Sequence, residues 1–139
     1  MNDMTDCIFC KIVRKEIPAT VVHENERAIV FMDIKPVNPG HMLIVPKKHF
    51  ADYASTSEEA LRDMAVAAKR MGKAAMDALG APGFNLAVNN GRLAGQLVDH
   101  VHLHVIPRFE GDGHGLWHGE PYKEGEMESV AEKLKTALS

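Results

Sequence analysis

The amino-acid sequence predicts an α+β fold in which a mostly antiparallel five-stranded sheet is combined with two main helices. Short apolar runs separated by polar or Gly/Pro turns recur along the chain, which is typical of strands in a meander. Two longer segments instead carry apolar residues at a 3.6-residue spacing, which is typical of amphipathic helices. Because the strands and the helices are segregated, the pattern favours an α+β class.

The expected elements begin with a short amphipathic helix over residues 7–15, which ends before Pro18. A loop marked by Pro36, Pro39 and Gly40 separates the second expected strand from the third. The five strands are expected at residues 21–24, 28–34, 41–46, 84–88 and 97–107.

Two main helices complete the prediction. The longer helix covers residues 57–79 and carries apolar residues on one face. Ser55 and Glu58, three residues apart, are expected to form a capping box at its start, and Gly80 is expected to end it. The second main helix covers residues 126–138 and has a single apolar stripe.

Length and composition indicate one ordinary globular domain, which we expect to span residues 1–139. The net charge of −3 provides no basic field, so no nucleic-acid partner is expected. No run approaches the ~20 consecutive apolar residues of a membrane span, so no membrane partner is expected either. The short acidic N-terminus and the presence of only two cysteines, Cys7 and Cys10, favour a cytoplasmic protein.

Three histidines alternate with apolar residues near the end of the predicted sheet. In a strand, His100, His102 and His104 would lie on one face, ~7 Å apart in succession, while the intervening apolar residues enter the core. A single histidine in a strand is usually structural. Three histidines aligned on one face instead indicate a functional site.

Two chemistries fit this row of imidazoles. His-x-His on a strand can supply zinc ligands and leave an open position for water, which would give a zinc-dependent hydrolase. Alternatively, one neutral imidazole attacks phosphorus and accepts a nucleotidyl or phosphoryl group. The spacing of the histidines does not decide between them.

The segment from His100 to Ile106 resembles the His-φ-His-φ-His-φ-φ signature of the histidine triad (HIT) family, where φ is apolar. The segments CIFCKIVRKEIPA at 7–19 and DIKPVNPGHMLIVPKKH at 33–49, and Gly95-Gln96, also resemble that family in the same order. The resemblance runs from about Cys7 to Arg108 and is closest to the purine-nucleoside phosphoramidase branch, some of whose members contain zinc. It implies a HIT-like fold.

The resemblance implies a nucleotidyl hydrolase or transferase with no catalytic cofactor. His102 would attack the α-phosphorus of a purine nucleotide conjugate and form a nucleotidyl-histidine that water hydrolyses. His104 would contact the α-phosphate and assist the leaving group, and His41 matches a further active-site histidine. Phosphoramidates, nucleotidyl-amines and diadenosine polyphosphates are the expected substrates. A non-catalytic nucleotide sensor or scaffold is the alternative from another class.

The resemblance also implies the residues that hold the nucleotide. Asp33 would accept hydrogen bonds from the ribose hydroxyls. A turn residue before Pro36 is the alternative, and its place at the end of an apolar strand favours the ribose role. The family commonly has a hydroxyl residue after Gly-Gln; here Leu97 removes that phosphate contact. The base is expected against an apolar slot, for which core packing is the competing explanation and for Phe31 an equally good one: Ile8, Phe9, Phe31 and Ile34. The phosphate region is expected to be lined by Asn89, Gly95 and Gln96.

The motif Cys7-x-x-Cys10 offers half of a tetrahedral zinc site. In zinc-bearing family members two such cysteines join two histidines, which correspond here to His49 and His100, and the resemblance implies a closed structural zinc. Two buried apolar cysteines or a redox pair are the alternatives, and the redox pair is the weaker because no thioredoxin-like βαβ pattern surrounds the motif. Family members also pair sheet edges, so a homodimer is expected. The segment 111–119 is expected to cover the site as a flap.

Overall fold

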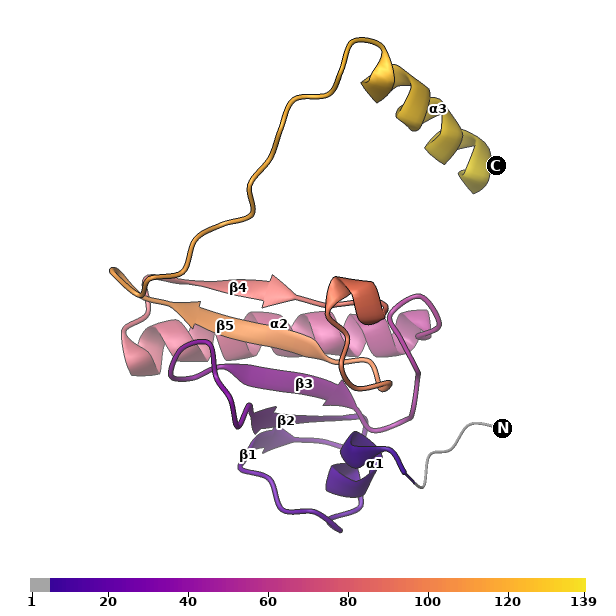
Figure 1. Cartoon of the computed structure of the whole chain (residues 1–139). Coiled ribbons are helices and arrows are strands. Elements are labelled where there is room, and N and C mark those ends of the chain that lie inside the picture. Colours follow the sequence, from indigo (N-terminus) through magenta and orange to yellow (C-terminus); the bar gives the residue numbers. More distant parts are fainter. Residues whose placement is uncertain (1–5) are drawn as a thin grey trace.

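The computed structural model describes residues 6–139, and Figure 1 shows their arrangement. Five strands form one sheet in the order β1-β2-β3-β5-β4, and every neighbouring pair is antiparallel. The expected fold class is therefore confirmed. In chain order the elements are α1 (Ile8–Val13), β1 (Val21–Glu24), β2 (Ala28–Met32), β3 (Met42–Pro46), α2 (Glu58–Leu79), β4 (Gly83–Ala87), the 3₁₀ turn η1 (Arg92–Ala94), β5 (Leu103–Arg108) and α3 (Glu126–Leu138).

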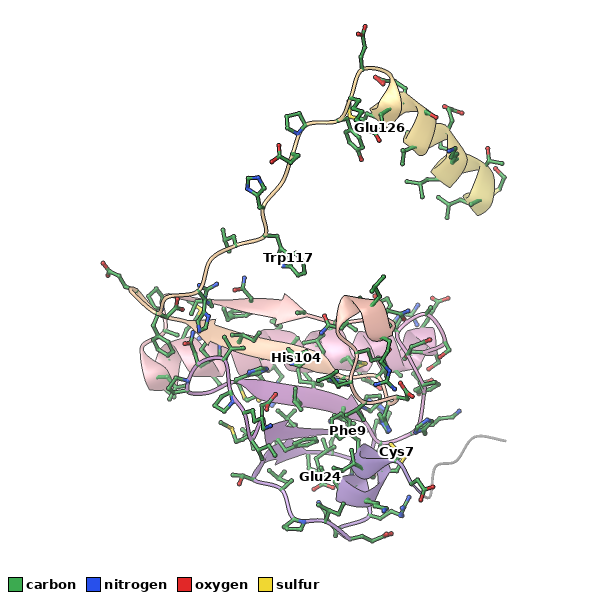
Figure 2. All side chains as sticks on the ribbon, in the orientation of Figure 1. Cys7, Phe9, Glu24, His104, Trp117 and Glu126 are labelled. Carbon is green, nitrogen blue, oxygen red and sulfur yellow. The ribbon has the colours of Figure 1, made fainter. Side chains whose placement is uncertain are left out.

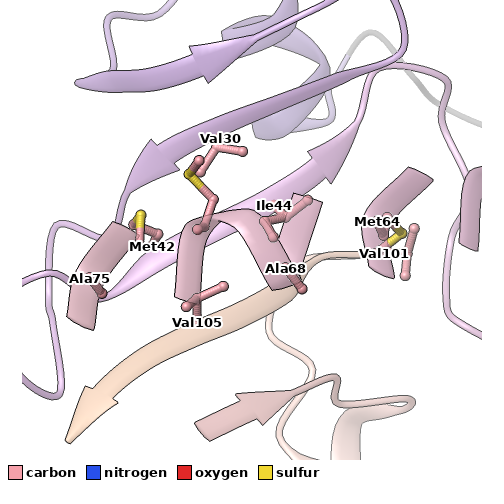
Figure 3. Close-up of a cluster of buried hydrophobic side chains, with 9 residues drawn as sticks. Val30, Met42, Ile44, Met64, Ala68, Ala75, Val101 and Val105 are labelled. Carbon is pink, nitrogen blue, oxygen red and sulfur yellow. The ribbon is translucent and has the colours of Figure 1, made fainter. Parts of the chain in front are cut away.

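Alternation along the central strands divides the apolar side chains between the two faces of the sheet. Val30 and Ile44 face α2, where Figure 3 shows them with Met64 and Ala68 in a fully buried cluster. Their strand neighbours, such as Ile29, face the opposite side and pack with Phe9 and Ile12 of α1. Burial on both faces explains why β2 and β3 are apolar throughout.

The start of α2 differs from the expected capping box. Ser57 is the N-cap, and its side chain accepts a hydrogen bond from the Ala60 backbone N–H. The Ser55 hydroxyl is used one turn earlier, where it donates to the Asp52 carbonyl, so it does not reach the helix. Gly80 ends the helix with φ of 70°, as expected for a C-cap glycine.

β5 begins at Leu103 rather than at residue 97. The β3–β5 pairing stops at Ile44 opposite Leu103, and the same register would place Pro46, which has no N–H to donate, opposite Val101. The Val101 N–H instead donates to the Phe50 carbonyl at 2.8 Å. The chain from residue 97 to 102 is therefore held by loop contacts, and the other helices and strands lie within two residues of their expected bounds.

The C-terminal residues leave the sheet after Arg108, turn at Asp112 and run to α3, which stands apart from the rest of the chain in Figure 1. α3 contains no buried residue. Residues 111–119 do not cover the site as the expected flap: Trp117 is 99% exposed and lies on the extended segment in Figure 2. Within residues 6–139 no helix is long and apolar enough to cross a bilayer.

Candidate functional site

β5 and the segment leading into it bring His102 and His104 next to His41. Val101 and Val105 enter the cluster beneath α2, so the intervening histidines face the α1 side of the sheet. The ring of His104 lies 5.1 Å from the rings of both His102 and His41. Figure 2 shows His104 on β5 and Phe9 on α1, and the Phe9 ring packs edge-on against the ring of His102 at 5.0 Å.

In the ring of His102 one nitrogen is hydrogen-bonded and the other is not. Its Nδ1–H donates to the His100 carbonyl at 2.8 Å, which assigns the lone pair to Nε2. Every buried side-chain nitrogen or oxygen among residues 6–139 has a partner, and Nε2 of His102 has none, so solvent reaches it. Burial lowers the pKa of His102, against the opposing effects of the His100 carbonyl and Asp33. The result is a neutral imidazole with a free nucleophilic nitrogen.

A chain of hydrogen bonds fixes the neutral tautomers of His41 and His104. The Val37 N–H donates to Nδ1 of His41 at 3.0 Å, so His41 carries its proton on Nε2. That Nε2–H donates to Nδ1 of His104 at 2.9 Å, which places the His104 proton on its own Nε2. His104 Nε2 has no partner within residues 6–139, and solvent reaches it by the same reasoning as for His102. It is a free N–H donor.

Lowered pKa values keep the rings of His104 and His41 uncharged at neutral pH. Burial lowers the pKa of His104 to about 4, and the neighbouring His102 and His41 add to the effect. Burial also lowers the pKa of His41, although Asp33 opposes it. Asp33 Oδ2 lies 3.6 Å from His41 Nε2, while its Oδ1 accepts from the Lys35 N–H. Asp33 is therefore both the expected turn residue and a neighbour of the histidines.

The four residues expected to hold the base fall into two pairs. Phe9 and Phe31 pack edge-on at 5.5 Å within the buried cluster under α1, as the core-packing explanation requires. Ile8 is half exposed, and Ile34 is 93% exposed. The two aromatic rings are therefore buried, with Phe9 packed against His102, whereas the two isoleucines lie at the surface.

The three residues expected to line the phosphate region lie in one loop, but Gln96 does not offer its amide to a ligand. Its Oε1 accepts from the Gly91 N–H, and its Nε2 donates to the Ala51 and Val98 carbonyls. Because the side chain is 3% exposed and its oxygen and nitrogen are all hydrogen-bonded, it holds the loop in shape. Gly95 has φ of 99°, and a Cβ there would lie 3.2 Å from Asn89 Nδ2. Asn89 and Gly95 are therefore neighbours, as expected.

Two thiols and two imidazoles meet on the α1 side of the site. The Nδ1 atoms of the histidines lie 3.3–3.5 Å from the sulfurs, with His49 next to Cys10 and His100 next to both cysteines. The His100 Nε2–H donates to the Pro46 carbonyl, which leaves the Nδ1 lone pair facing the thiols. The edge of a tetrahedral zinc site between a thiolate and an imidazole nitrogen is about 3.6 Å. The donor atoms, their tautomer and their spacing therefore fit zinc.

A second group of possible ligands does not fit a metal. Asp33, His41 and His104 also lie within 4.8 Å of one another. The lone pair on Nδ1 of His41 is occupied by the Val37 N–H, and its Nε2 carries the proton, so neither nitrogen is free for an ion. His102 belongs to neither group, and the triad histidines thus do not converge on one ion. This geometry disfavours the zinc-hydrolase alternative.

A cavity of ≈ 420 Å³ opens beside the thiol–imidazole cluster. Cys7, His49 and Leu97 line it, whereas His102 and His104 do not. Leu97 is 77% exposed. Because it is a leucine, it presents no hydroxyl or other polar group at this position. The cavity therefore belongs to the cluster and not to the reactive nitrogen.

Sequence reasoning missed the groups that support the histidine row. The Val37 N–H, the Asn38 amide and the Asp112 carboxylate all lie within a few hydrogen bonds of His41. His114 is exposed but donates from Nε2 to the Val37 carbonyl at 3.1 Å. No spacing or periodicity signals the contacts of Asn38 with Asp112 and of Val37 with His114, because they join residues 74 and 77 positions apart.

Comparison with known proteins identifies the class. The HIT domain model matches residues 14–111, and the chain therefore belongs to the HIT family. An adenosine 5′-monophosphoramidase of Schizosaccharomyces pombe is 36% identical, over 95% of this chain and 98% of its own. A HIT-family structure from Bacillus subtilis has a TM-score of 0.87 at 34% identity, over 96% of this chain and 98% of its own. A zinc-bound histidine triad protein of Mycobacterium smegmatis has a TM-score of 0.77 at 36% identity, over 96% and 99%.

Acidification tests the buried, neutral state of His104. The folded-state pKa of about 4 lies below the 6.5 of an ordinary histidine, so the unfolded chain binds the extra proton between these values and stability is lost as pH falls through them. From pH 7 to pH 5, wild type should lose about 1–2 kcal/mol more unfolding free energy than His104→Gln in denaturant titrations. His118→Gln, at an exposed position, should follow wild type. Equal pH slopes for wild type and His104→Gln would contradict the assignment.

Proposed function

We propose that this chain is a nucleotidyl hydrolase that cleaves the bond between the α-phosphorus of a purine nucleotide and its leaving group. The observation that carries the proposal is the free, solvent-reached Nε2 of His102, whose ring is fixed by the His100 carbonyl. The phosphoramidase named among its relatives supports a nucleotide conjugate as substrate. Phosphoramidates, nucleotidyl-amines and diadenosine polyphosphates are the proposed substrate classes.

The reaction would proceed in two displacements at phosphorus. In the first, the His102 Nε2 lone pair forms a bond to the α-phosphorus while the bond to the leaving group breaks; an amine departs with a proton taken from solvent. The His100 carbonyl, bound to Nδ1–H, stabilises the positive charge that the ring gains. In the second, water attacks, the phosphorus–nitrogen bond breaks and the nucleoside monophosphate leaves, with one water proton released to solvent.

The neighbouring groups have separate proposed roles. The free Nε2–H of His104 would donate to a phosphoryl oxygen and stabilise the charge that develops there, as a neutral imidazole can. His41 would hold that tautomer. Asp33 would accept hydrogen bonds from the ribose, with its Oδ2 on the histidine side. Asn89 and Gly95 would border the phosphate, and Phe9 would lie beneath the base.

A non-catalytic nucleotide sensor is the second candidate. The same pocket residues would serve it, but a sensor needs no free imidazole nitrogen. The orientation of the His102 ring favours the enzyme, and turnover separates the two.

We also propose a structural zinc ion held by Cys7, Cys10, His49 and His100. A zinc ion there would tie α1 to the segment that carries His102, since His100 is both ligand and hydrogen-bond partner of that ring. Burial raises the pKa of the Cys10 thiol to about 11, and zinc binding would displace that proton. The zinc-bound relative supports the assignment. Thiols kept as ligands suit a reducing compartment such as the cytoplasm.

We propose that the protein works as a homodimer. β4 forms one edge of the sheet, and Leu86 on it is exposed. The C-terminal residues 109–139 present uncovered apolar side chains, including those of Trp117 and Leu134. They carry three basic and seven acidic residues, a net charge of −4, whereas residues 1–108 carry +1. A second copy of the chain offers both the apolar cover and the complementary charge.

Substitution of His102 tests the proposed function. His102→Ala should lose hydrolysis of adenosine 5′-phosphoramidate by at least about a thousandfold while its Kd for adenosine monophosphate stays within about threefold. Rapid acid-free denaturation of wild type during turnover should trap labelled nucleotide on the chain. His118→Ala is the matched control and should keep full activity. Unchanged turnover by His102→Ala, or no turnover by wild type on any of the three substrate classes, would defeat the enzyme assignment.

Metal analysis tests the zinc proposal. Freshly purified protein should contain close to one zinc per chain, and His49→Ala should lose most of it together with thermal stability, because one of four ligands is missing. His23→Ala, which removes a histidine outside the cluster, should keep the metal. A zinc content near zero in wild type, or full zinc in His49→Ala, would rule out the ligand set.

Sedimentation tests the homodimer. Wild type should sediment at twice the 15.3 kDa chain mass at micromolar concentration. Leu134→Glu, on the apolar stripe of α3, should shift the mass toward the monomer, because burial of a carboxylate against an apolar surface is unfavourable. Thr136→Glu, on the opposite side of α3, should remain dimeric. A wild-type monomer at this concentration would contradict the proposal.

A further inference from the structure

Asp112 is the acceptor at the centre of a hydrogen-bond network outside the histidine row. Its carboxylate accepts from Arg108 Nε at 2.8 Å, from Arg108 Nη2 at 3.1 Å and from Asn38 Nδ2 at 2.9 Å. It also accepts from the backbone N–H groups of Phe109 and His114. The side chain is only 7% exposed, and these donors hold the pKa of Asp112 well below its usual range. A carboxylate bonded in this way fixes every segment that donates to it.

Two of these segments reach the loop between β2 and β3. Asn38 is buried and bridges Asp112 to the Pro107 carbonyl, which fixes this loop against the end of β5. His114, whose backbone N–H is held by Asp112, donates from its ring to the Val37 carbonyl. The network thus holds the residues on both sides of the Val37–Asn38 peptide.

The same loop sets the tautomers of the site. The Val37 N–H donates to Nδ1 of His41, and His41 Nε2–H donates in turn to Nδ1 of His104. Without the Val37 donor, His41 could carry its proton on Nδ1 and offer a lone pair to His104. His104 would then hold its proton on Nδ1, and the atom facing the substrate would be an acceptor that repels a phosphoryl oxygen.

We propose that Asp112 is a positioning residue that keeps the Val37 N–H on His41 and thereby keeps His104 as a hydrogen-bond donor to the phosphoryl group. The inference rests on the proposed hydrolase function for its catalytic consequence. The structural part, control of two tautomers by a carboxylate in the turn after β5, stands without it. Asp112 itself touches neither His41 nor His104, and acts through Asn38 and His114.

Nitrogen-15 NMR of the histidine rings tests the structural part and needs no turnover. Wild type should show the Nε2–H tautomer at both His41 and His104 at pH 7. Asp112→Asn should show a mixture of tautomers at both rings. Asp77→Asn, which removes an exposed carboxylate bonded to Lys73 on α2, is the control and should match wild type. Unchanged tautomers in a folded Asp112→Asn protein would overturn the proposal.

Kinetics tests the catalytic consequence. In Asp112→Asn, kcat/KM for adenosine 5′-phosphoramidate should fall by about tenfold, since only part of the donor's effect is lost when tautomers mix. The inhibition constant of adenosine, which has no phosphate, should stay within about twofold. A rise in that constant in step with the loss of turnover would mean that the loop carrying Asp33 has moved, and would overturn the tautomer explanation. If wild type does not turn over, the proposed function fails and the NMR result still decides the tautomer claim.

A second variant covers the case in which Asp112→Asn does not fold. His114→Ala removes only the ring contact to the Val37 carbonyl, at an exposed residue. It should shift the same two tautomers in the same direction by a smaller amount. Wild-type tautomers in His114→Ala, together with an unfolded Asp112→Asn, would reduce Asp112 to a purely structural residue and overturn the proposal.

Discussion

The hydrogen bond from the His102 ring to the His100 carbonyl is the interaction on which the reactive site depends. It spans only two residues, in a segment that lies just before β5 and is not paired as a strand. A ring held through Nδ1 has its second nitrogen free, and burial keeps that nitrogen unprotonated at neutral pH. The local backbone therefore orients the ring and leaves the Nε2 lone pair available.

His100 also connects the His102 ring to the thiol–imidazole cluster. The carbonyl of His100 bonds the His102 ring, its own ring faces Cys7 and Cys10, and its Nε2–H is bound by Pro46. Each of these polar groups of His100 has its own bonding partner, which explains why a histidine can be fully buried here. Support for α1 and orientation of the reactive ring are therefore parts of one local structure.

The sequence pattern predicts those parts of the fold and site that depend on local alternation or on a family signature. Alternation predicts that His100, His102 and His104 share one face, and the signature brings His49 to the cysteines. It fails for Ser55 and does not anticipate the hydrogen bonds of Gln96, because both depend on how loops turn. Contacts such as Asn38 with Asp112 join residues 74 positions apart, and they depend on loop geometry that no periodicity encodes. Long-range polar contacts are therefore what sequence reasoning leaves out.

The Gln96 amide has a consequence for the sheet itself. The β4–β5 register, continued beyond Ala87 opposite His104, would bring Gly91 opposite His100. There Gln96 Oε1 accepts the Gly91 N–H at 2.9 Å, so this N–H is not available to the His100 carbonyl that orients the His102 ring. Continued pairing of β4 with the chain before β5 would therefore compete with the observed orientation of the His102 ring. The side-chain amide of Gln96 ends this pairing early.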